Sequence, residues 1–146
     1  MKKKVCFSIV SHGQSSLTNL LLTDIDKNII LQDFDLEVLV TDNINEKCWK
    51  PLLHNFKLRK ISNLRKKGFG ANHNAAYEIS EPDFLFVINP DVRIEETINL
   101  DTFINQMVDM NLYTPKIVNE FGTLEDYKRK QITFLNLIRR RLSMQE

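Results

Sequence analysis

The segment from Lys67 to Asp91, KGFGANHNAAYEISEPDFLFVINPD, decides the fold expected for this chain. It combines a glycine turn, a short helix and the apolar run Phe84–Ile88, which is typical of a strand covered on both faces. The strand stops at Asn89-Pro90-Asp91, because proline cannot continue a hydrogen-bonded ladder. We therefore expect Asp91 just past the carboxyl end of a central strand, the edge at which open α/β sheets bind ligands.

The glycine turn has features of an anion site. Gly68 and Gly70 suit either a positive φ or the close approach of a ligand to the backbone. Asn72 and Asn74 place short polar side chains in the first turn of the following helix, where unpaired N–H groups favour an anion. The turn lacks the third glycine of G-x-G-x-x-G, because His73 occupies that position, and it lacks the Lys-Ser/Thr of a P-loop.

Two further apolar runs, Val5–Val10 and Leu36–Thr41, are typical of buried strands, and a brief strand is expected near Leu58–Ile61. Ser15 or Ser16 can cap a helix after the first strand. Strands that alternate with helices predict a parallel or mostly parallel sheet with right-handed crossovers. We predict a single Rossmann-like domain over residues 1–146, with three α/β/α layers.

The rest of the chain is expected to add smaller elements. A helix is predicted from about Glu95 to Asp109, a strand over Leu112–Val118 and a turn at Asn119–Gly122. A basic amphipathic helix is predicted within residues 131–143. This helix suits either docking on the domain or peripheral contact with an anionic membrane surface.

Polar residues follow three of the expected strands, which predicts a binding cleft at one sheet edge. They are Ser11-His12, Asp42-Asn43 and Asn89-Pro90-Asp91. Asp42 suits hydrogen bonds from a base or ribose, or the capping of the next turn. Asp91 suits Mg²⁺ or Mn²⁺, which are held by carboxylate and phosphate oxygens, but an Asp after proline is also a common turn or helix-capping residue.

Charge and composition narrow the partners. The net charge is +1, so no global field indicates nucleic acid. A basic run precedes the glycine turn, and within it Arg65 is the candidate for a diphosphate, because its guanidinium fork matches phosphate oxygens. Cys6 and Cys48 fit neither a disulfide framework nor a metal knuckle. With no secretory signal or spanning segment in the sequence, we expect a cytoplasmic protein, whose peripheral contact with a membrane would be at the inner face of the plasma membrane.

With these residues the chain resembles the N-terminal portion of a family 2 glycosyltransferase of the GT-A type. The likeness is to bacterial rhamnosyltransferase-like enzymes of surface-polysaccharide synthesis. It is carried by FSIVSHGQ, LVTDN, NLRKKGFGANHNAA, DFLFVINPDV and YTPKIVNEFGTLEDYKRK, and so extends over nearly the whole chain.

The resemblance implies a UDP- or dTDP-sugar donor, a Mg²⁺ or Mn²⁺ ion, and transfer of the sugar to a saccharide or lipid-linked acceptor. It implies that Ser11 and His12 line the base pocket and that Asp42 holds the base or ribose. The INPD segment stands where related enzymes have an Asp-x-Asp motif, with Asn89 in place of the first Asp. Asp91 is then the metal ligand. The resemblance also implies that the diphosphate and sugar side of the pocket is shaped by Gly68, Gly70, Asn72 and Asn74.

Family members usually continue well beyond this length, through an acidic segment that supplies the catalytic base. No catalytic base can be named in this sequence. A second hypothesis is therefore an incomplete nucleotide-sugar-binding module that acts with a partner subunit or a second copy. A third, a dinucleotide-binding protein, is disfavoured by the missing glycine.

Overall fold

The computed structural model describes residues 2–46, 53–107, 112–115, 117–119 and 121–125. The chain divides into two compact units, Met1–Met107 and Val108–Glu146. The predicted basic amphipathic helix within residues 131–143 lies outside the described residues. The prediction of one domain over residues 1–146 stays a prediction.

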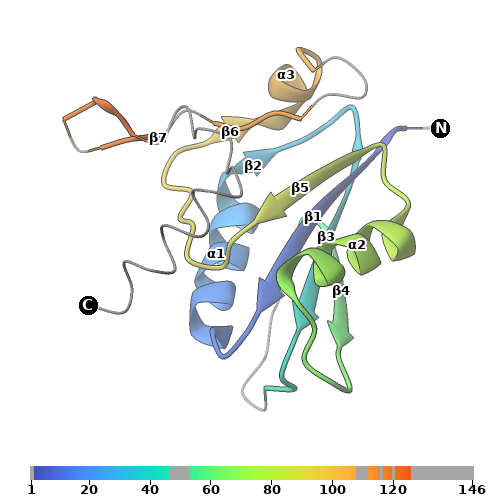
Figure 1. Cartoon of the computed structure of the whole chain (residues 1–146). Helices are drawn as coiled ribbons and strands as arrows, with labels where there is room; N and C mark the ends of the chain where they lie inside the picture. The colour runs from blue at the N-terminus through green and yellow to red at the C-terminus, as the bar shows by residue number, and fades with distance from the viewer. Residues whose placement is uncertain (1, 47–52, 108–111, 116, 120, 126–146) are drawn as a thin grey trace, which may run out of the picture. The chain divides into compact units, whose positions relative to one another are not determined.

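The first unit is built on a parallel four-stranded sheet in the order β4-β3-β1-β5 (Figure 1). Its strands are β1 (Lys4–Ser11), β3 (Asp35–Asp42), β4 (Lys57–Ser62) and β5 (Phe84–Ile88). Every neighbouring pair is parallel, so all four strands end at the same edge. The predicted α/β fold with a mostly parallel sheet is confirmed.

Helices cover both faces of this sheet. Helix α1 (Ser15–Asn28) packs Leu21, Leu22 and Ile25 against one set of strand residues, which includes Val5, Phe7, Val38 and Val40. Helix α2 (Phe69–Ser80) packs Ala76 against Cys6 and Leu39 on the opposite face. Successive strand residues point to opposite faces, so two separate cores form and the layers are α/β/α.

The position of β5 differs from the prediction. We expected a central strand covered on both faces, but among the described strands β5 lies at the edge of the sheet. Phe84, Phe86 and Ile88 pack on the α1 side, whereas Val87 is 49% exposed. An apolar run therefore did not distinguish a central strand from an edge strand whose second face is partly open.

The predicted helix from Glu95 to Asp109 is also wrong. Ile98–Asn99 instead forms the short strand β6, parallel to β2 (Ile29–Ile30), and of the described residues 95–107 only Leu100–Ile104 is α-helical, as α3. The Asn99 carboxamide oxygen accepts from the N–H of Thr102 at 3.1 Å, which caps the helix there.

In the second unit β7 (Ile117–Val118) and β8 (Leu124–Glu125) form an antiparallel hairpin. The predicted turn at Asn119–Gly122 is confirmed by the bond from Gly122 N–H to the carbonyl of Asn119. The strand predicted over Leu112–Val118 is reduced to β7. Pro115 cannot donate to a ladder, and 112–115 has no regular structure. No helix among the described residues is long and apolar enough to cross a membrane.

Candidate functional site

A cavity of about 430 Å³ opens at the carboxyl edge of the sheet. Residues after three strands and the start of α2 line it, as the rule for ligand sites in open α/β sheets predicts. The lining residues are Val10, His12, Gln14, Asn43, Lys66, Lys67, Gly68, Phe69, Asn72, Asn89, Pro90 and Asp91. The segments that decided the fold thus also form this cavity.

Six of the residues singled out from the sequence line the cavity: His12, Asn43, Gly68, Asn72, Asn89 and Asp91. Five others do not: Ser11, Asp42, Arg65, Gly70 and Asn74. Ser11 and Asp42 are buried in contacts with neighbouring loops, and Arg65, Gly70 and Asn74 are exposed. The expected roles of these five in ligand binding stay predictions, without support from the cavity.

Three asparagines fix the turn that precedes α2. Asn43 Oδ1 accepts from the backbone N–H of Lys67 at 2.9 Å, while Asn43 Nδ2 donates to the Lys67 carbonyl at 3.0 Å. Asn72 Nδ2 donates to the same carbonyl at 3.3 Å. Asn63 Nδ2 bridges the other two side chains, donating to Asn43 Oδ1 at 2.9 Å and to Asn72 Oδ1 at 2.7 Å. The network ties the ends of β3 and β4 to the first turn of α2.

Gly68 follows this turn and adopts an extended conformation, with φ −69° and ψ 162°. It therefore does not need glycine for a positive φ, the first alternative from the sequence. A Cβ at Gly68 would meet no heavy atom within 4 Å, so the glycine leaves open space beside the cavity. The remaining alternative is the close approach of a ligand to this backbone.

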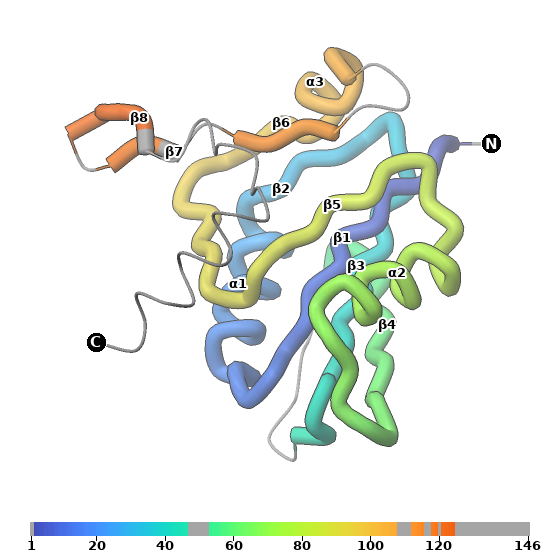
Figure 2. The backbone as a smooth tube through the Cα atoms, in the orientation of Figure 1, coloured from blue at the N-terminus to red at the C-terminus, as the bar shows by residue number. Residues whose placement is uncertain are grey.

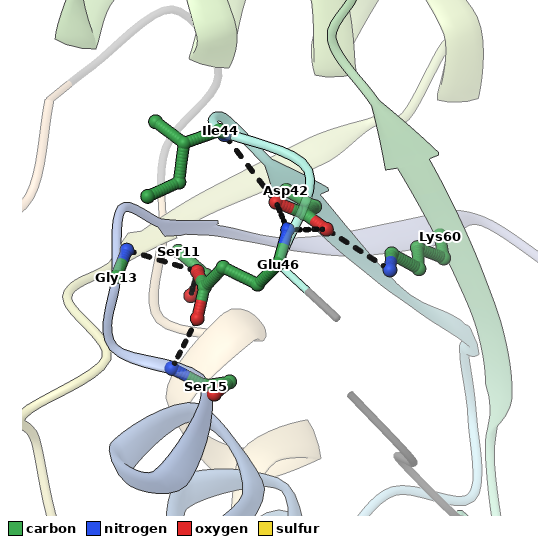
Figure 3. Close-up of polar contacts among 7 residues, drawn as sticks. All are labelled: Ser11, Gly13, Ser15, Asp42, Ile44, Glu46 and Lys60. Atoms are coloured by element: carbon green, nitrogen blue, oxygen red, sulfur yellow. Dashed lines mark hydrogen bonds and ion pairs between the residues drawn. The ribbon is translucent and has the colours of Figure 1, made fainter. Parts of the chain in front are cut away.

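Asp42 makes the contacts of a loop cap. Its carboxylate accepts from the N–H of Glu46 at 2.9 and 3.0 Å and pairs with the Lys60 ammonium at 3.0 Å (Figure 3). Burial raises the pKa of Asp42, but the Glu46 amide and Lys60 outweigh it and hold the pKa below its usual value. Of the two alternatives for Asp42, capping is the one that the geometry supports.

Glu46, which the sequence did not indicate, binds the loop between β1 and α1. Its carboxylate accepts from the Ser11 hydroxyl at 2.5 Å and from the N–H groups of Gly13 and Ser15 at 2.9 Å (Figure 3). Burial raises the pKa of Glu46, but these donors outweigh it and lower the pKa. Ser15 is therefore the first helical residue, capped by Glu46, rather than the cap itself. The contact holds the loop that carries His12.

The strand end that carries Asp91 is tied to α1. Arg93 forms two hydrogen bonds with the Asp24 carboxylate, at 2.6 and 3.0 Å, and the N–H of Ile94 adds a third at 3.2 Å. The Arg93 guanidinium holds the pKa of Asp24 below its usual value. This pair fixes the chain just after Asp91.

Asp91 itself is exposed at the cavity, beside Asn89. The described residues contain no group of three or more His, Cys, Asp or Glu side chains that could hold a metal. One carboxylate with a neighbouring amide fits a hard cation only if ligand phosphate and water supply the other oxygens, which is the usual arrangement for Mg²⁺.

His73 is buried next to the cavity wall. Its Nδ1 lies 2.8 Å from the Ser8 hydroxyl, and its ring packs edge-on against Phe69 at 4.4 Å between centroids. Its Nε2 has no hydrogen-bond partner among the described residues. Burial lowers the pKa of His73, so the neutral ring is favoured at neutral pH. His73 does not line the cavity, in agreement with a satisfied packing role at Nδ1.

Two positioning residues were missed from the sequence. Asn63 follows β4 as Asn43 follows β3, so the strand-end argument, applied to a fourth strand, could have found it. Glu46 contacts residues 31 to 35 positions earlier in the chain, and no local pattern indicates such a contact.

No protein-family model and no curated protein matches this chain. Among solved structures it is similar to TarS 1–349 from S. aureus, with a TM-score of 0.51 and 17% sequence identity. The match covers 72% of this chain and 31% of the TarS chain. A likeness at this identity shows a shared α/β fold over the matched part.

Proposed function

We propose that this chain is the donor-binding domain of a glycosyltransferase that uses a nucleoside diphosphate sugar. The observation that carries the proposal is the cavity at the carboxyl edge, where Asp91 lies with Lys66, Lys67 and the start of α2. The finer assignment is an inverting family 2 enzyme of O-antigen, capsule or lipopolysaccharide synthesis. TarS, whose fold this chain shares, is itself a glycosyltransferase, which supports the general activity.

Each lining group has a part in this proposal. The first N–H groups of α2 and the ammonium groups of Lys66 and Lys67 suit the diphosphate, because both supply positive charge to an anion. Asn43 holds the Lys67 turn in place, and Gly68 allows the phosphates to approach the backbone. His12 and Gln14, after β1, are placed for the base or ribose. The enzyme would then act mainly through positioning and electrostatic stabilisation of the leaving diphosphate.

Asp91, with Asn89 beside it, would hold Mg²⁺ or Mn²⁺. When bound, the cation would neutralise charge on the leaving nucleoside diphosphate. Because the chain supplies only one carboxylate there, we expect the cation to bind together with the nucleotide rather than before it.

Calorimetric titration with UDP and dTDP, with and without Mn²⁺, tests the site. We expect Mn²⁺-dependent binding that is lost in Asp91→Ala. Asp33→Ala is the matched control, because Asp33 is an exposed carboxylate outside the cavity. Unchanged binding in Asp91→Ala would remove the metal role, and no binding of either nucleotide to the wild-type chain would contradict the proposal.

A second candidate is a nucleotide-sugar-binding module that needs a partner for transfer. Among the described residues, Asp91 is the only carboxylate that lines the cavity, and a metal ligand cannot also serve as a free base. Sugar transfer to a saccharide or lipid-linked acceptor by the purified chain would exclude this candidate. Donor binding without transfer would favour it.

A further inference from the structure

The loop between β4 and α2 carries the most exposed large apolar side chain of the described residues. Leu64 is fully exposed, at 103% of its reference area. Phe69, which follows the same loop, is 61% exposed, and Ile44, in the loop after the neighbouring strand β3, is 46% exposed. A single exposed leucine is common, but a group of exposed apolar residues at one edge indicates an interaction surface.

The same loop is strongly basic. Arg65, Lys66 and Lys67 are consecutive, and residues 63–70 contain no Asp or Glu. Among the described residues no carboxylate forms an ion pair with any of these three side chains. The loop therefore places three adjacent positive charges next to an apolar tip.

The loop lies at the rim of the cavity. The chain leaves β4 at the carboxyl edge, turns, and enters α2 (Figure 2). Lys66, Lys67 and Phe69 line the cavity, whereas Leu64 and Arg65 do not. The tip of the loop is thus free for a contact other than the ligand in the cavity.

We propose that the tip of this loop, which spans residues 63–68, docks on an anionic phospholipid surface. Leu64 enters the boundary between headgroups and acyl chains, and Arg65 binds a headgroup phosphate, while Lys66 and Lys67 stay at the cavity and add positive charge beside the lipid surface. A free phosphate ligand would satisfy the charges but would leave Leu64 in water, so the combination favours a bilayer. If the proposed function holds, the cavity mouth then opens next to the membrane, within reach of a lipid-linked acceptor.

Vesicle co-sedimentation of the full chain tests the docking. We expect binding to phosphatidylcholine vesicles that contain phosphatidylglycerol, weaker binding without it, and a loss of binding at high salt. Leu64→Ser is expected to lower the affinity about tenfold, as burial of one leucine side chain predicts. Leu20→Ser on α1, where Leu20 is 45% exposed and far from the loop in sequence, is expected to bind like the wild type.

A second variant reports the contact directly. Leu64→Trp is expected to show a blue shift of its fluorescence on vesicles, whereas Leu20→Trp does not, and the single native tryptophan is common to both. Equal vesicle binding by wild type and Leu64→Ser would overturn the proposal, because another surface would then carry the contact. Equal binding to neutral and anionic vesicles, or no binding, would also overturn it. Titration of Leu64→Ser with UDP and Mn²⁺ tests the donor site separately from vesicle binding. A failure of the docking proposal is thus distinguished from a failure of the proposed function.

Discussion

The Nδ2 atom of Asn63 donates to Oδ1 of Asn72 at 2.7 Å, and so joins the loop after β4 to the first turn of α2. The same Nδ2 atom contacts Asn43 at 2.9 Å. One side chain therefore connects three elements that meet at the cavity. Asn63 does not line the cavity, but it donates to Asn43 and Asn72, which do, so it is a positioning residue.

Asn63→Ala is expected to destabilise the fold and weaken nucleotide binding together. The substitution removes the Asn63 Nδ2 donor from Asn72 Oδ1, and an unsatisfied buried polar group costs about 1–3 kcal/mol. Urea unfolding and titration with UDP and Mn²⁺ measure the two effects.

Asn74→Ala is the matched control, because Asn74 lies on α2 two residues after Asn72 but is exposed and outside the cavity. We expect it to leave affinity and stability nearly unchanged. If Asn74→Ala weakened binding as much as Asn63→Ala, the hydrogen bonds of Asn63 to Asn43 and Asn72 would not account for the effect.

Glu46→Ala is expected to free the loop between β1 and α1. The carboxylate accepts three hydrogen bonds from that loop, and bonds to a charged group contribute about 1.5–3 kcal/mol each at most, with overlap between them. We expect a loss of about 2 kcal/mol in the free energy of unfolding. Glu46→Gln should lose less, because one amide oxygen can still accept.

Chemical denaturation compares these variants with Glu78→Ala, which removes an exposed carboxylate from α2. If the Glu46→Ala protein had the same free energy of unfolding as the Glu78→Ala protein, Glu46 would not stabilise the loop between β1 and α1. Hydrogen exchange at the Gly13 and Ser15 amides gives a local reading, since both N–H groups would lose their acceptor.

Much of the fold was predictable because it rests on local patterns. The apolar runs placed β1, β3 and β5, and the glycine turn placed the start of α2. The edge position of β5 was not predictable, since an apolar run does not reveal how many neighbours a strand has. The helix expected after Asp91 failed for a similar reason: the pairing of β6 with β2 joins residues 69 positions apart.

The candidate site, like the fold, was only partly predictable from the sequence. The strand-end rule found Asn43, Asn89 and Asp91, because the carboxyl ends of parallel strands meet whatever the details of packing. The residues that hold the loops, such as Glu46 and Asp24, act through contacts between distant positions. Neither their residue types nor their spacing distinguishes them from ordinary surface carboxylates.

Asp24→Asn is expected to weaken Mn²⁺-dependent nucleotide binding without touching the ligand. The Asp24 carboxylate accepts from Arg93 and Ile94, which lie two and three residues after Asp91. An amide in its place loses the charge and one acceptor, so the segment with Asp91 becomes less well positioned. We expect a higher Kd for UDP with Mn²⁺ and a smaller change without Mn²⁺.

Asp26→Asn is the matched control on the same helix. Asp26 accepts from the N–H groups of His54 and Asn55, which lie outside the cavity lining. Both variants should lose stability in urea unfolding, but only Asp24→Asn should lose nucleotide affinity. An equal loss of affinity in both would mean that binding follows global stability rather than the position of Asp91.

The buried His73 predicts a loss of stability under mildly acidic conditions. Burial lowers its pKa in the folded state below the ordinary value of about 6.5, so the unfolded chain takes up a proton first. The contribution of His73 is therefore constant above about pH 6.5, and stability falls as the pH drops from there towards the lowered folded pKa. Carboxylates titrate near pH 4, and those of Asp24, Asp42 and Glu46 lie lower still, so they act in a separate window.

Urea unfolding at a series of pH values between about 7 and 5 measures this slope. His73→Gln keeps a polar group near Ser8 but does not titrate, so we expect a shallower pH dependence than in the wild type. His54→Gln is the matched control, because it makes the same change at an exposed histidine. A wild-type slope in His73→Gln would show that another group carries the acid sensitivity, and that the buried ring is protonated equally in the folded and unfolded chains.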